Sequence, residues 1–426
     1  MFKITAFQVC QKLRNANFYE MVLIFVLLAG IIATSSANMT GEAVIHNMGR
    51  MIPAITAKSG YWRDIQDAVD LAASLGGGIV RIPEGTWNFV NVSESWTGAR
   101  VTIPAGISLF GATTERYPNG SVVEWRTVLV MPWDMPGSKS YYPPHWFLMQ
   151  GTSDPSKPSR FSDIKLVGYK DLNLSATGFY RGICVSGVVD FRIDHCSFKE
   201  VPEGIAVGLN TRYSSCGVID HNVFDNEYAS YNLDWATRNV GYAIDIYRQE
   251  SETKWQPLTD LLGKYVDYTI FIEDNVFTKW RSVVSGNYGA HYVFRYNTVI
   301  YGLAVGEVDL HPSWNSPYVG CRAVEVYGNT FTSPDPAGNI YGLFAVEMHS
   351  GSGVFFNNTV SGHETFIRTN NAGWSEVFYP HDIYIWDNNI GKAIVVDGSA
   401  ILNDDYFLYK PDSYAPYPYP HPLTLM

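Results

Sequence analysis

A short segment of alternating apolar residues that ends in a polar turn recurs along the second half of the chain. Its copies are FRIDHCSF at 191–198, GVIDHNVF at 217–224, FIEDNVF at 271–277, VFRYNTV at 293–299, VEVYGNTF at 324–331, VFFNNTV at 354–360 and IYIWDNNI at 383–390. Self-similarity with a period of about 20–50 residues is typical of solenoid proteins, in which each repeat forms one coil. The sequence therefore predicts a solenoid.

Aligning the copies on the polar position that follows each strand gives one column, composed of Cys196, Asn222, Asn275, Asn297, Asn329, Asn358 and Asn388. The steps along this column are 26, 53, 22, 32, 29 and 30 residues, and we interpret the step of 53 as two turns with one weak copy. Asn tolerates a left-handed backbone, and its amide can bond to the same amide on the next coil. The column therefore predicts an asparagine ladder along one turn.

Strands of this length and pattern predict parallel stacking, with large apolar side chains pointing inward and polar side chains pointing outward. About 13 coils at a spacing of ~4.8 Å would give a shaft ~60 Å long. Ahead of the repeats, the segment from Trp62 to Leu75 predicts an amphipathic helix that Gly76-Gly77-Gly78 ends. The apolar face of this helix consists of Ile65, Ala68, Val69 and Ala72. We expect the helix to cap the first open edge of the coil.

The composition excludes a disordered chain, because 46% of the 426 residues are hydrophobic and only 17% are charged. The formal net charge is −11, from 30 basic and 41 acidic residues, so no general attraction to nucleic acid or anionic lipid is expected. Any polyanionic partner would need a local basic cluster or bound cations. Four cysteines follow residue 37 (Cys184, Cys196, Cys216 and Cys321), and one disulfide is left open.

The first residues resemble an export signal. Lys3, Lys12 and Arg14 precede an apolar run over residues 21–33, and small side chains up to Ala37 offer a cleavage site. We therefore predict a signal peptide over 1–37, a linker over 38–60, a β-helix over 61–400 and a Pro/Tyr-rich tail over 401–426. The predicted location is extracellular, with no membrane span after cleavage. The alternative is a cell-surface protein tethered by an uncleaved N-terminal segment.

The segment DIQDAVDLAASLGGGIVRIPEGTW at 64–87 resembles the opening of the pectate-lyase-like superfamily of right-handed parallel β-helices, which includes glycosidases and phage tailspikes. VVDFRIDHCSF at 188–198 is similar to the strand and turn of extracellular pectate lyases, with Arg192 in place of a Trp. The likeness covers about residues 60–395. It implies an all-β fold, a single-stranded right-handed parallel β-helix, although a fold alone does not define a function.

The resemblance also implies site residues. An acidic pair that holds calcium in such lyases corresponds here to Glu203 and Val207, so Glu203 is the only matched metal ligand. Of two family arginines, Arg322 matches one, and the position of the arginine that acts as a base holds Pro317. The expected cofactor is therefore none or calcium.

The residues themselves suggest a candidate catalytic cluster around the segment GEVDLH at 306–311. If this segment is extended, Glu307, Asp309 and His311 alternate onto one face, where carboxylates and an imidazole can exchange protons. Arg322 would stabilise a uronate or a developing anion. A solvated strand face is the competing interpretation. The candidate substrate-binding residues are Arg281, His291, Glu347, His349 and Trp314.

Three further features of the sequence lie outside this candidate cluster. Asp194-His195 and Asp220-His221 recur at the same repeat position, which indicates a role in the turn rather than in catalysis. Trp280, Trp314 and Trp374 suit either sugar stacking or burial under a loop. The insertion from Tyr228 to Tyr268 is too long for a turn and would wall a groove.

These observations predict a secreted carbohydrate-active protein, a polysaccharide lyase or glycosidase that acts on an extracellular glycan, with an acidic glycan left open. The alternative is a noncatalytic adhesin, glycan-binding or fibre-forming protein. A polysaccharide is the expected partner in either case, and a homo-oligomer or fibre is left open.

Overall fold

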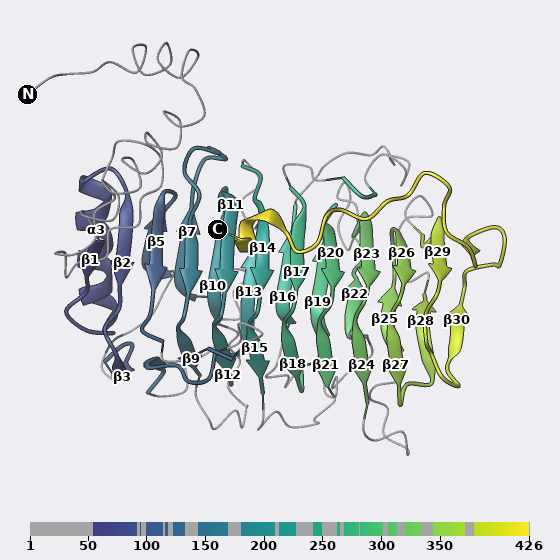
Figure 1. The fold of residues 1–426 in the computed structure, drawn as a ribbon, viewed down its shortest axis with the longest axis horizontal. Coiled ribbons are helices and arrows are strands. Elements are labelled where there is room, and N and C mark those ends of the chain that lie inside the picture. Colours follow the sequence, from purple (N-terminus) through teal and green to yellow (C-terminus); the bar gives the residue numbers. More distant parts are fainter. Residues whose placement is uncertain are drawn as a thin grey trace, which may run out of the picture. The chain divides into compact units, whose positions relative to one another are not determined.

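The strands of the protein form three all-parallel sheets, and each coil between the two ends of the shaft contributes one strand to each of them in turn (Figure 1). The first, here called sheet A, has 12 strands among the described residues. They are β1 (Ala54–Thr56), β2 (Gly78–Arg81), β5 (Ile107–Phe110), β8 (Arg160–Ser162), β11 (Val189–Asp194), β14 (Cys216–Asp220), β17 (Ile270–Glu273), β20 (His291–Arg295), β23 (Ala323–Tyr327), β26 (Ser352–Phe356), β29 (Ile383–Trp386) and β31 (Tyr406–Phe407).

Sheet B has nine strands in the described part of the chain, and sheet C has ten. Sheet B consists of β3 (Gly85–Asn88), β6 (Thr127–Val130), β9 (Lys165–Val167), β12 (Ser197–Lys199), β15 (Val223–Asp225), β18 (Val276–Thr278), β21 (Thr298–Ile300), β24 (Thr330–Thr332) and β27 (Thr359–Ser361). Sheet C consists of β4 (Ala99–Pro104), β7 (His145–Gln150), β10 (Arg181–Ser186), β13 (Glu203–Val207), β16 (Tyr242–Tyr247), β19 (Ser282–Asn287), β22 (Val308–Leu310), β25 (Phe344–Met348), β28 (Thr365–Thr369) and β30 (Ile394–Gly398).

This arrangement confirms the predicted right-handed parallel β-helix. The structure, a computed structural model, describes residues 54–91, 94, 99–113, 116–117, 122–132, 144–168, 180–208, 213–226, 242–248, 262–264, 268–280, 282–300, 306–312, 320–333, 344–370 and 379–425. The predicted signal peptide lies outside the described residues, as does all but the end of the predicted linker. No helix in the described ranges is both long enough and apolar enough to span a bilayer.

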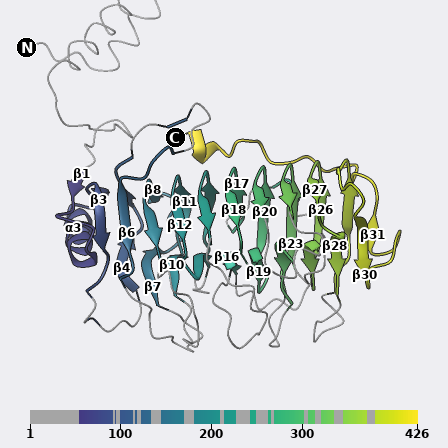
Figure 2. The ribbon, with the colours of Figure 1, turned by 90° about the horizontal axis from the view of Figure 1, so that it is seen from below.

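The predicted helix is α3 (Trp62–Ser74), and the four residues assigned to its apolar face are its buried residues. Figures 1 and 2 show it at the end of the shaft that carries β1 and β2. Its side chains join the same apolar core as the inward residues of the coils. Burial of this face therefore holds the helix on the first coils, as predicted.

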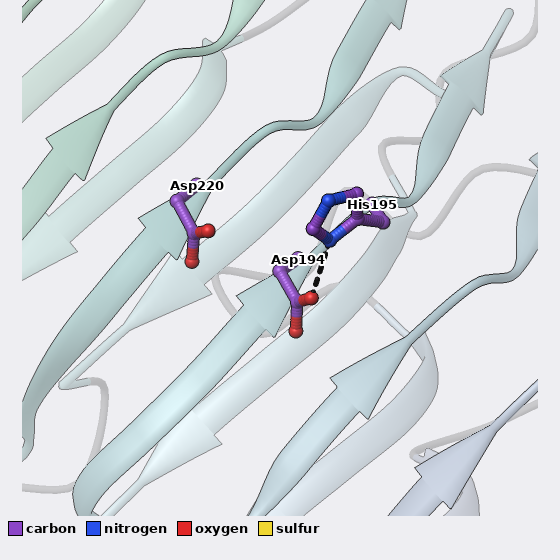
Figure 3. A group of neighbouring side chains, drawn as sticks. All are labelled: Asp194, His195 and Asp220. Carbon is purple, nitrogen blue, oxygen red and sulfur yellow. Dashed lines mark hydrogen bonds and ion pairs between the residues drawn. The ribbon is translucent and has the colours of Figure 1, made fainter. Parts of the chain in front are cut away.

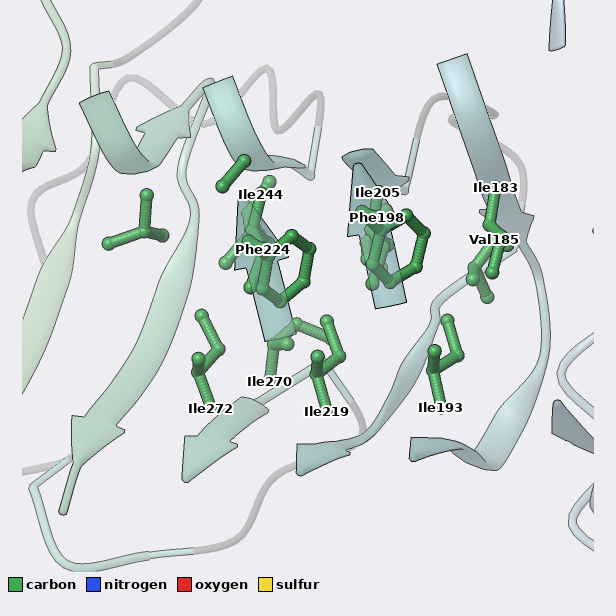
Figure 4. Packing of buried hydrophobic residues seen from close by; sticks show 14 of the residues in the cluster. Ile183, Val185, Ile193, Phe198, Ile205, Ile219, Phe224, Ile244, Ile270 and Ile272 are labelled. Carbon is green, nitrogen blue, oxygen red and sulfur yellow. The ribbon is translucent and has the colours of Figure 1, made fainter. Parts of the chain in front are cut away.

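The core is a set of stacks in which like side chains lie over one another from coil to coil (Figure 4). Phe198 and Phe224 stack with ring centroids 4.6 Å apart, and Phe224 stacks on Phe277 at 4.8 Å. Ile193, Ile219 and Ile272 form a corresponding column on sheet A. Burying each side chain of this size stabilises the folded state by about 1.5–3 kcal/mol. The burial of the inward side chains therefore stabilises the stacked coils.

The asparagine ladder is present. Nδ2 of Asn297 donates to Oδ1 of Asn329 at 3.2 Å, and Nδ2 of Asn329 donates to Oδ1 of Asn358 at 3.0 Å. The same bond links Asn222 to Asn275 at 3.0 Å. Because β14 pairs directly with β17, the step of 53 residues is one coil with a long insertion, and its assignment to two turns was wrong.

The ladder residue was expected to have the left-handed backbone. In the structure the residue before it has this backbone in each turn. These residues have φ between 52° and 68°, and they are His195, His221, Asp274, Tyr296, Gly328, Asn357 and Asp387. The ladder residue itself accepts a backbone N–H from the preceding coil, as when Asn297 N donates to Asn329 Oδ1 at 2.9 Å. The amide is therefore used for hydrogen bonding, and the strained backbone is placed next to it.

The C-terminal segment runs back along the outside of sheet A, from β29 toward β11 (Figures 1 and 2). It ends in the short 3-10 helix η3 (Pro422–Leu425). Tyr414 and Tyr417 pack with outward side chains of sheet A in a second apolar cluster. The tail is thus part of the folded shaft. The four cysteines after residue 37 are free, buried thiols.

Candidate functional site

The outward face of sheet C carries a column of polar side chains on four successive strands. Asp245 of β16 is in register with Ser285 of β19, Ser285 with Asp309 of β22, and Asp309 with Glu347 of β25. The residues on either side of each point into the apolar core, so these four point outward. We call them the sheet C column. Parallel pairing without offsets therefore brings together carboxylates that are far apart in the chain.

A second row follows two residues later on each strand, composed of Tyr247, Asn287, His311 and His349. Tyr247 and Asn287 are register partners at the ends of their strands. The backbone of His311 continues the ladder by donating to Gly286, and that of His349 by donating to Leu310, each at 3.0 Å. The alternation expected for an extended segment thus holds for Asp309 and His311.

Two carboxylate–imidazole pairs lie on adjacent coils. His311 Nε2 is 4.0 Å from Asp309 Oδ2, and His349 Nε2 is 3.6 Å from Glu347 Oε1. The two imidazole centroids are 6.3 Å apart. Burial alone would lower the pKa of His349, but the bond to Glu347 and the negative charge of Asp309 raise it above its usual value. The arrangement therefore favours the protonated form of His349 more than an isolated imidazole would.

Hydrogen bonds connect Asp309 to Asp245 across the intervening coil. Ser285 Oγ lies 3.3 Å from Asp309 Oδ2, and Asn287 Nδ2 donates to Ser285 Oγ at 3.2 Å and to Asp245 Oδ1 at 2.9 Å. The hydroxyl of Tyr247 donates to the other oxygen of Asp245. Burial and the negative charge of Glu203 raise the pKa of Asp245 to about 8. Asp245 is therefore suited to hold a proton at neutral pH.

Sequence reasoning missed Asp245 and Tyr247, because they lie in the insertion between two repeats. A signal was present, however. Asp245-Ile246-Tyr247, Asp309-Leu310-His311 and Glu347-Met348-His349 share an acid, an apolar residue and a ring-bearing polar residue. Aligning the strands of sheet C on this pattern would have identified all three.

Glu203, the expected calcium ligand, lies on β13 one coil before Asp245. Its Oε1 accepts a bond from Arg181 Nε at 2.6 Å, and both side chains are almost fully buried. Calcium binds six to eight oxygen ligands, whereas here a guanidinium occupies the carboxylate. The residues present do not fit calcium at Glu203.

Glu307 was expected to share the face of Asp309, but the structure places it elsewhere. It lies at a bend before β22, and its Oε1 is 3.1 Å from Nε2 of His363, with both side chains buried. The extended segment on which the expectation rested begins only at Val308. Glu307 is thus part of a buried ion pair.

Arg322 lies just before β23, where Cys321 N donates to the carbonyl of His311 at 2.9 Å. Its positive charge affects the pKa of His291. Burial, together with the positive charges of Arg248 and Arg322, lowers that pKa to about 3. His291 begins β20 of sheet A and is fully buried, with Nδ1 3.2 Å from Thr269 Oγ1. The charge of Arg322 is therefore close enough to His291 to perturb it.

Several expected residues cannot be placed. Arg281, Trp314, Trp374 and Pro317 lie outside the described residues. Trp280 is 1% exposed and meets the ring of Phe224 edge to face at 6.1 Å, which makes it a core residue. Of the two interpretations left open for Trp280, the structure shows burial and not an exposed platform for sugars.

Asp194, His195 and Asp220 form a cluster on sheet A whose potential ligand atoms all lie within 4.8 Å of one another (Figure 3). Both oxygens of Asp194 accept bonds from Arg160, at 2.6 and 2.5 Å, and Arg192 binds both oxygens of Asp220, at 2.9 and 2.8 Å. Burial alone would raise the pKa of Asp194, but His195 and the arginines hold it well below its usual value. The cluster is a charge-balanced network that supports the turn.

Comparison with solved structures agrees with the fold. Two complexes of mutant tailspike protein of E. coli bacteriophage HK620 with a pentasaccharide match with TM-scores of 0.52 and 0.50 and sequence identities of 14% and 13%. Each match covers 83% of this chain and 60% of the tailspike chain. An alginate lyase from Paenibacillus sp. strain FPU-7 matches with a TM-score of 0.43 at 11% identity, over 80% of this chain and 97% of the lyase.

These identities show the fold alone: the protein is a right-handed parallel β-helix. The chain spans about 60% of the length of the tailspike that it matches. No protein-family model matches the sequence, and no curated protein matches it.

Proposed function

We propose that the protein is a secreted carbohydrate-active enzyme that hydrolyses glycosidic bonds at the sheet C column. The observation that carries this proposal is the pair of carboxylate–imidazole contacts on adjacent coils, Asp309 with His311 and Glu347 with His349. Groups that can accept and donate protons are what glycoside hydrolysis requires. A pentasaccharide bound by the tailspike of similar fold supports a carbohydrate ligand.

The pairing of the strands that carry the two carboxylates supports hydrolysis with retention of configuration. Asp309 and Glu347 are register partners on neighbouring parallel strands, whose backbones are about 4.8 Å apart. Retaining glycosidases place their two carboxyl groups about 5–5.5 Å apart, one as the nucleophile and one as the acid and base. His349 would exchange a proton with Glu347, which leaves Asp309 as the nucleophile.

A lyase is the weaker form of the same proposal. Eliminating a uronate needs a cation that neutralises its carboxylate, and Arg322, the expected candidate, lies just before β23 of sheet A and not on a strand of sheet C. The low exposure of Asp309 and Glu347, 7% and 6%, favours the alternative of a noncatalytic fibre or adhesin.

Export of the protein is also a proposal, resting on the basic and apolar pattern of residues 1–37. Sequencing the N-terminus of protein recovered from the medium tests it. A mature chain that begins at residue 38 is expected, and recovery of uncleaved protein in the cell membrane would contradict cleavage.

The test of the enzyme is an assay of the mature chain on neutral and acidic polysaccharides, with reducing ends and unsaturated uronides measured separately. New reducing ends without unsaturated uronides are expected. Asp309→Asn and Glu347→Gln should each abolish them. Asp397→Asn is the matched control, because Asp397 occupies the same register column on β30 and is exposed. Unsaturated products would indicate a lyase, and no product from any glycan would support the noncatalytic alternative.

A further inference from the structure

Three buried carboxylates lie on the outward face of sheet C. Asp245, Asp309 and Glu347 lie on β16, β22 and β25, and each is at most 7% exposed. Glu203 is near them on β13, but it precedes the core residue Ile205 by two positions and is not part of this register column. Arg181 neutralises Glu203 through the buried ion pair. The charge that a ligand meets therefore depends on Asp245, Asp309, Glu347 and the neighbouring imidazoles.

The net charge of these carboxylates and imidazoles does not become positive while the carboxylates are ionised. The pairs Asp309–His311 and Glu347–His349 are neutral if both imidazoles hold a proton, and negative if either loses it. Asp245 adds a negative charge or none. A uronate placed along this column would meet repulsion or neutral pairs, whereas a hydroxyl or ammonium group would meet acceptors.

One carboxylate oxygen of the sheet C column lacks a hydrogen-bond donor among the described residues. Oδ1 of Asp309 is buried and accepts no hydrogen bond from the described residues. Its other oxygen lies near Ser285 and His311. A buried carboxylate oxygen without a donor is destabilising, and a ligand that donates a hydrogen bond to it would remove that destabilisation.

The next side chain in the register column is Arg368 of β28, which is positively charged. Its guanidinium lies over the ring of Phe344, 4.6 Å from the ring centroid. Cation–π stacking directs this charge toward Phe344 at the start of the neighbouring strand. Arg368 is thus the described residue of this column through which a uronate could be recognised. Substituting it therefore tests whether the column prefers an acidic glycan.

We infer that the ligand of the sheet C column is a glycan whose sugars present hydroxyl or ammonium donors, and no carboxylate, to Asp309 and Glu347. The preferred substrate is therefore a neutral or amino-sugar polymer rather than the acidic glycan that the sequence suggested. This inference rests on the proposed function, because it assumes that the column binds a glycan.

The test measures binding separately from turnover. Affinity electrophoresis of the mature chain in gels that contain galactomannan, chitosan or polygalacturonate gives an apparent affinity for each polymer. We expect galactomannan or chitosan to bind at least about tenfold more tightly than polygalacturonate. Binding of chitosan should weaken with added salt, and binding of galactomannan should not, which distinguishes an ammonium donor from a hydroxyl donor.

Variants locate the preference. Asp309→Asn and Glu347→Gln keep the side-chain shape and should each reduce binding of the preferred polymer about tenfold, whereas Asp397→Asn should not. Thermal melts of all three establish that the fold is retained. Tighter binding of polygalacturonate, lost in Arg368→Gln, would overturn the inference, as would equal binding by all variants or no binding of any polymer.

The two proposals fail differently. Binding that depends on Asp309 without release of reducing ends would overturn the proposed hydrolase and support the inferred ligand class. Cleavage of polygalacturonate alone would support an enzyme and overturn the ligand class.

Discussion

Arg295 and Glu273 form an ion pair on the outside of sheet A in which neither side chain is exposed. Arg295 Nη2 is 2.6 Å from Glu273 Oε2, and the C-terminal segment covers the pair. The guanidinium also donates to the carbonyls of Tyr417 and Pro418, at 2.8 and 3.0 Å. A charged pair has thus been enclosed by folding the tail over a sheet that would otherwise face water.

Removing one charge of this pair should be costly. Glu273→Gln leaves the buried guanidinium of Arg295 without its counter-charge, and we expect a loss of about 3–5 kcal/mol in the free energy of unfolding. Urea denaturation followed by tryptophan fluorescence measures it. Glu84→Gln, at the exposed pair of Glu84 with Arg126, should leave stability unchanged. Equal effects of the two substitutions would contradict the assignment.

The tail is also held by Tyr414, whose hydroxyl donates to Glu325 Oε2 at 2.7 Å. Tyr414→Phe removes this donor but keeps the ring in the apolar cluster, so Glu325 loses one of its two described partners. We expect a loss of about 1–3 kcal/mol and faster proteolysis of the tail. The exposed Tyr409 provides the control, and a Tyr409→Phe variant that is equally destabilised would refute the explanation.

The asparagine ladder should be sensitive in its middle. Asn297→Ala removes the bonds to Asn329 and leaves the buried backbone N–H of Asn275 without its acceptor, Oδ1 of Asn297. The expected loss is about 1–3 kcal/mol in the free energy of unfolding by chemical denaturation. Asn88→Ala, at an exposed position of β3, should be near neutral. A neutral Asn297→Ala would show that the ladder does not stabilise the shaft.

The buried pair of His363 and Glu307 makes stability depend on pH. Burial alone would lower the pKa of His363, but the charge of Glu307 and the bond to it raise the pKa above the ordinary value of 6.5. The pair therefore contributes fully below pH 6.5, and its contribution is lost as the pH rises through the raised pKa. The destabilisation caused by His363→Gln should be largest in mild acid and shrink in alkaline solution.

Thermal denaturation over a pH series checks this expectation. In a Glu307→Gln background the His363→Gln substitution should lose its pH dependence, because the partner charge is gone. A pH dependence that persists in the double variant would assign it to another group.

Chelation should have no effect on the shaft. Glu203 is bound to Arg181, so dialysis against EDTA should leave the melting temperature unchanged, and added calcium should not raise it. Differential scanning calorimetry with and without calcium measures this melting temperature. A calcium-dependent increase that Glu203→Gln abolishes would restore the calcium site suggested by the sequence resemblance.

The fold was predictable because its determinants are local and repeated. The ladder position of Asn297 and the buried face of α3 could be identified from spacing alone. The 53-residue step was misread because length cannot distinguish an inserted loop from an additional coil. The left-handed residue was misplaced by one position, since Asn suits both the strained backbone and the hydrogen bond.

The candidate site was predictable only in part. Alternation along one strand is a local property, so the proximity of Asp309 and His311 followed from it. Glu307 lies one residue before the strand, where the chain bends, and alternation no longer applies. Asp245 lies in an insertion, and nothing in the spacing indicated which coil it joins.

The amino-acid sequence by itself determined a stack of parallel coils with an apolar interior, because each repeat carries its own inward residues and its own turn. Only the tertiary structure decided which outward side chains meet. The connections between strands vary in length, so residues distant in the sequence come into register through the pairing of coils. Asp309 faces Glu347, Glu307 meets His363, and the tail covers Arg295 for that reason.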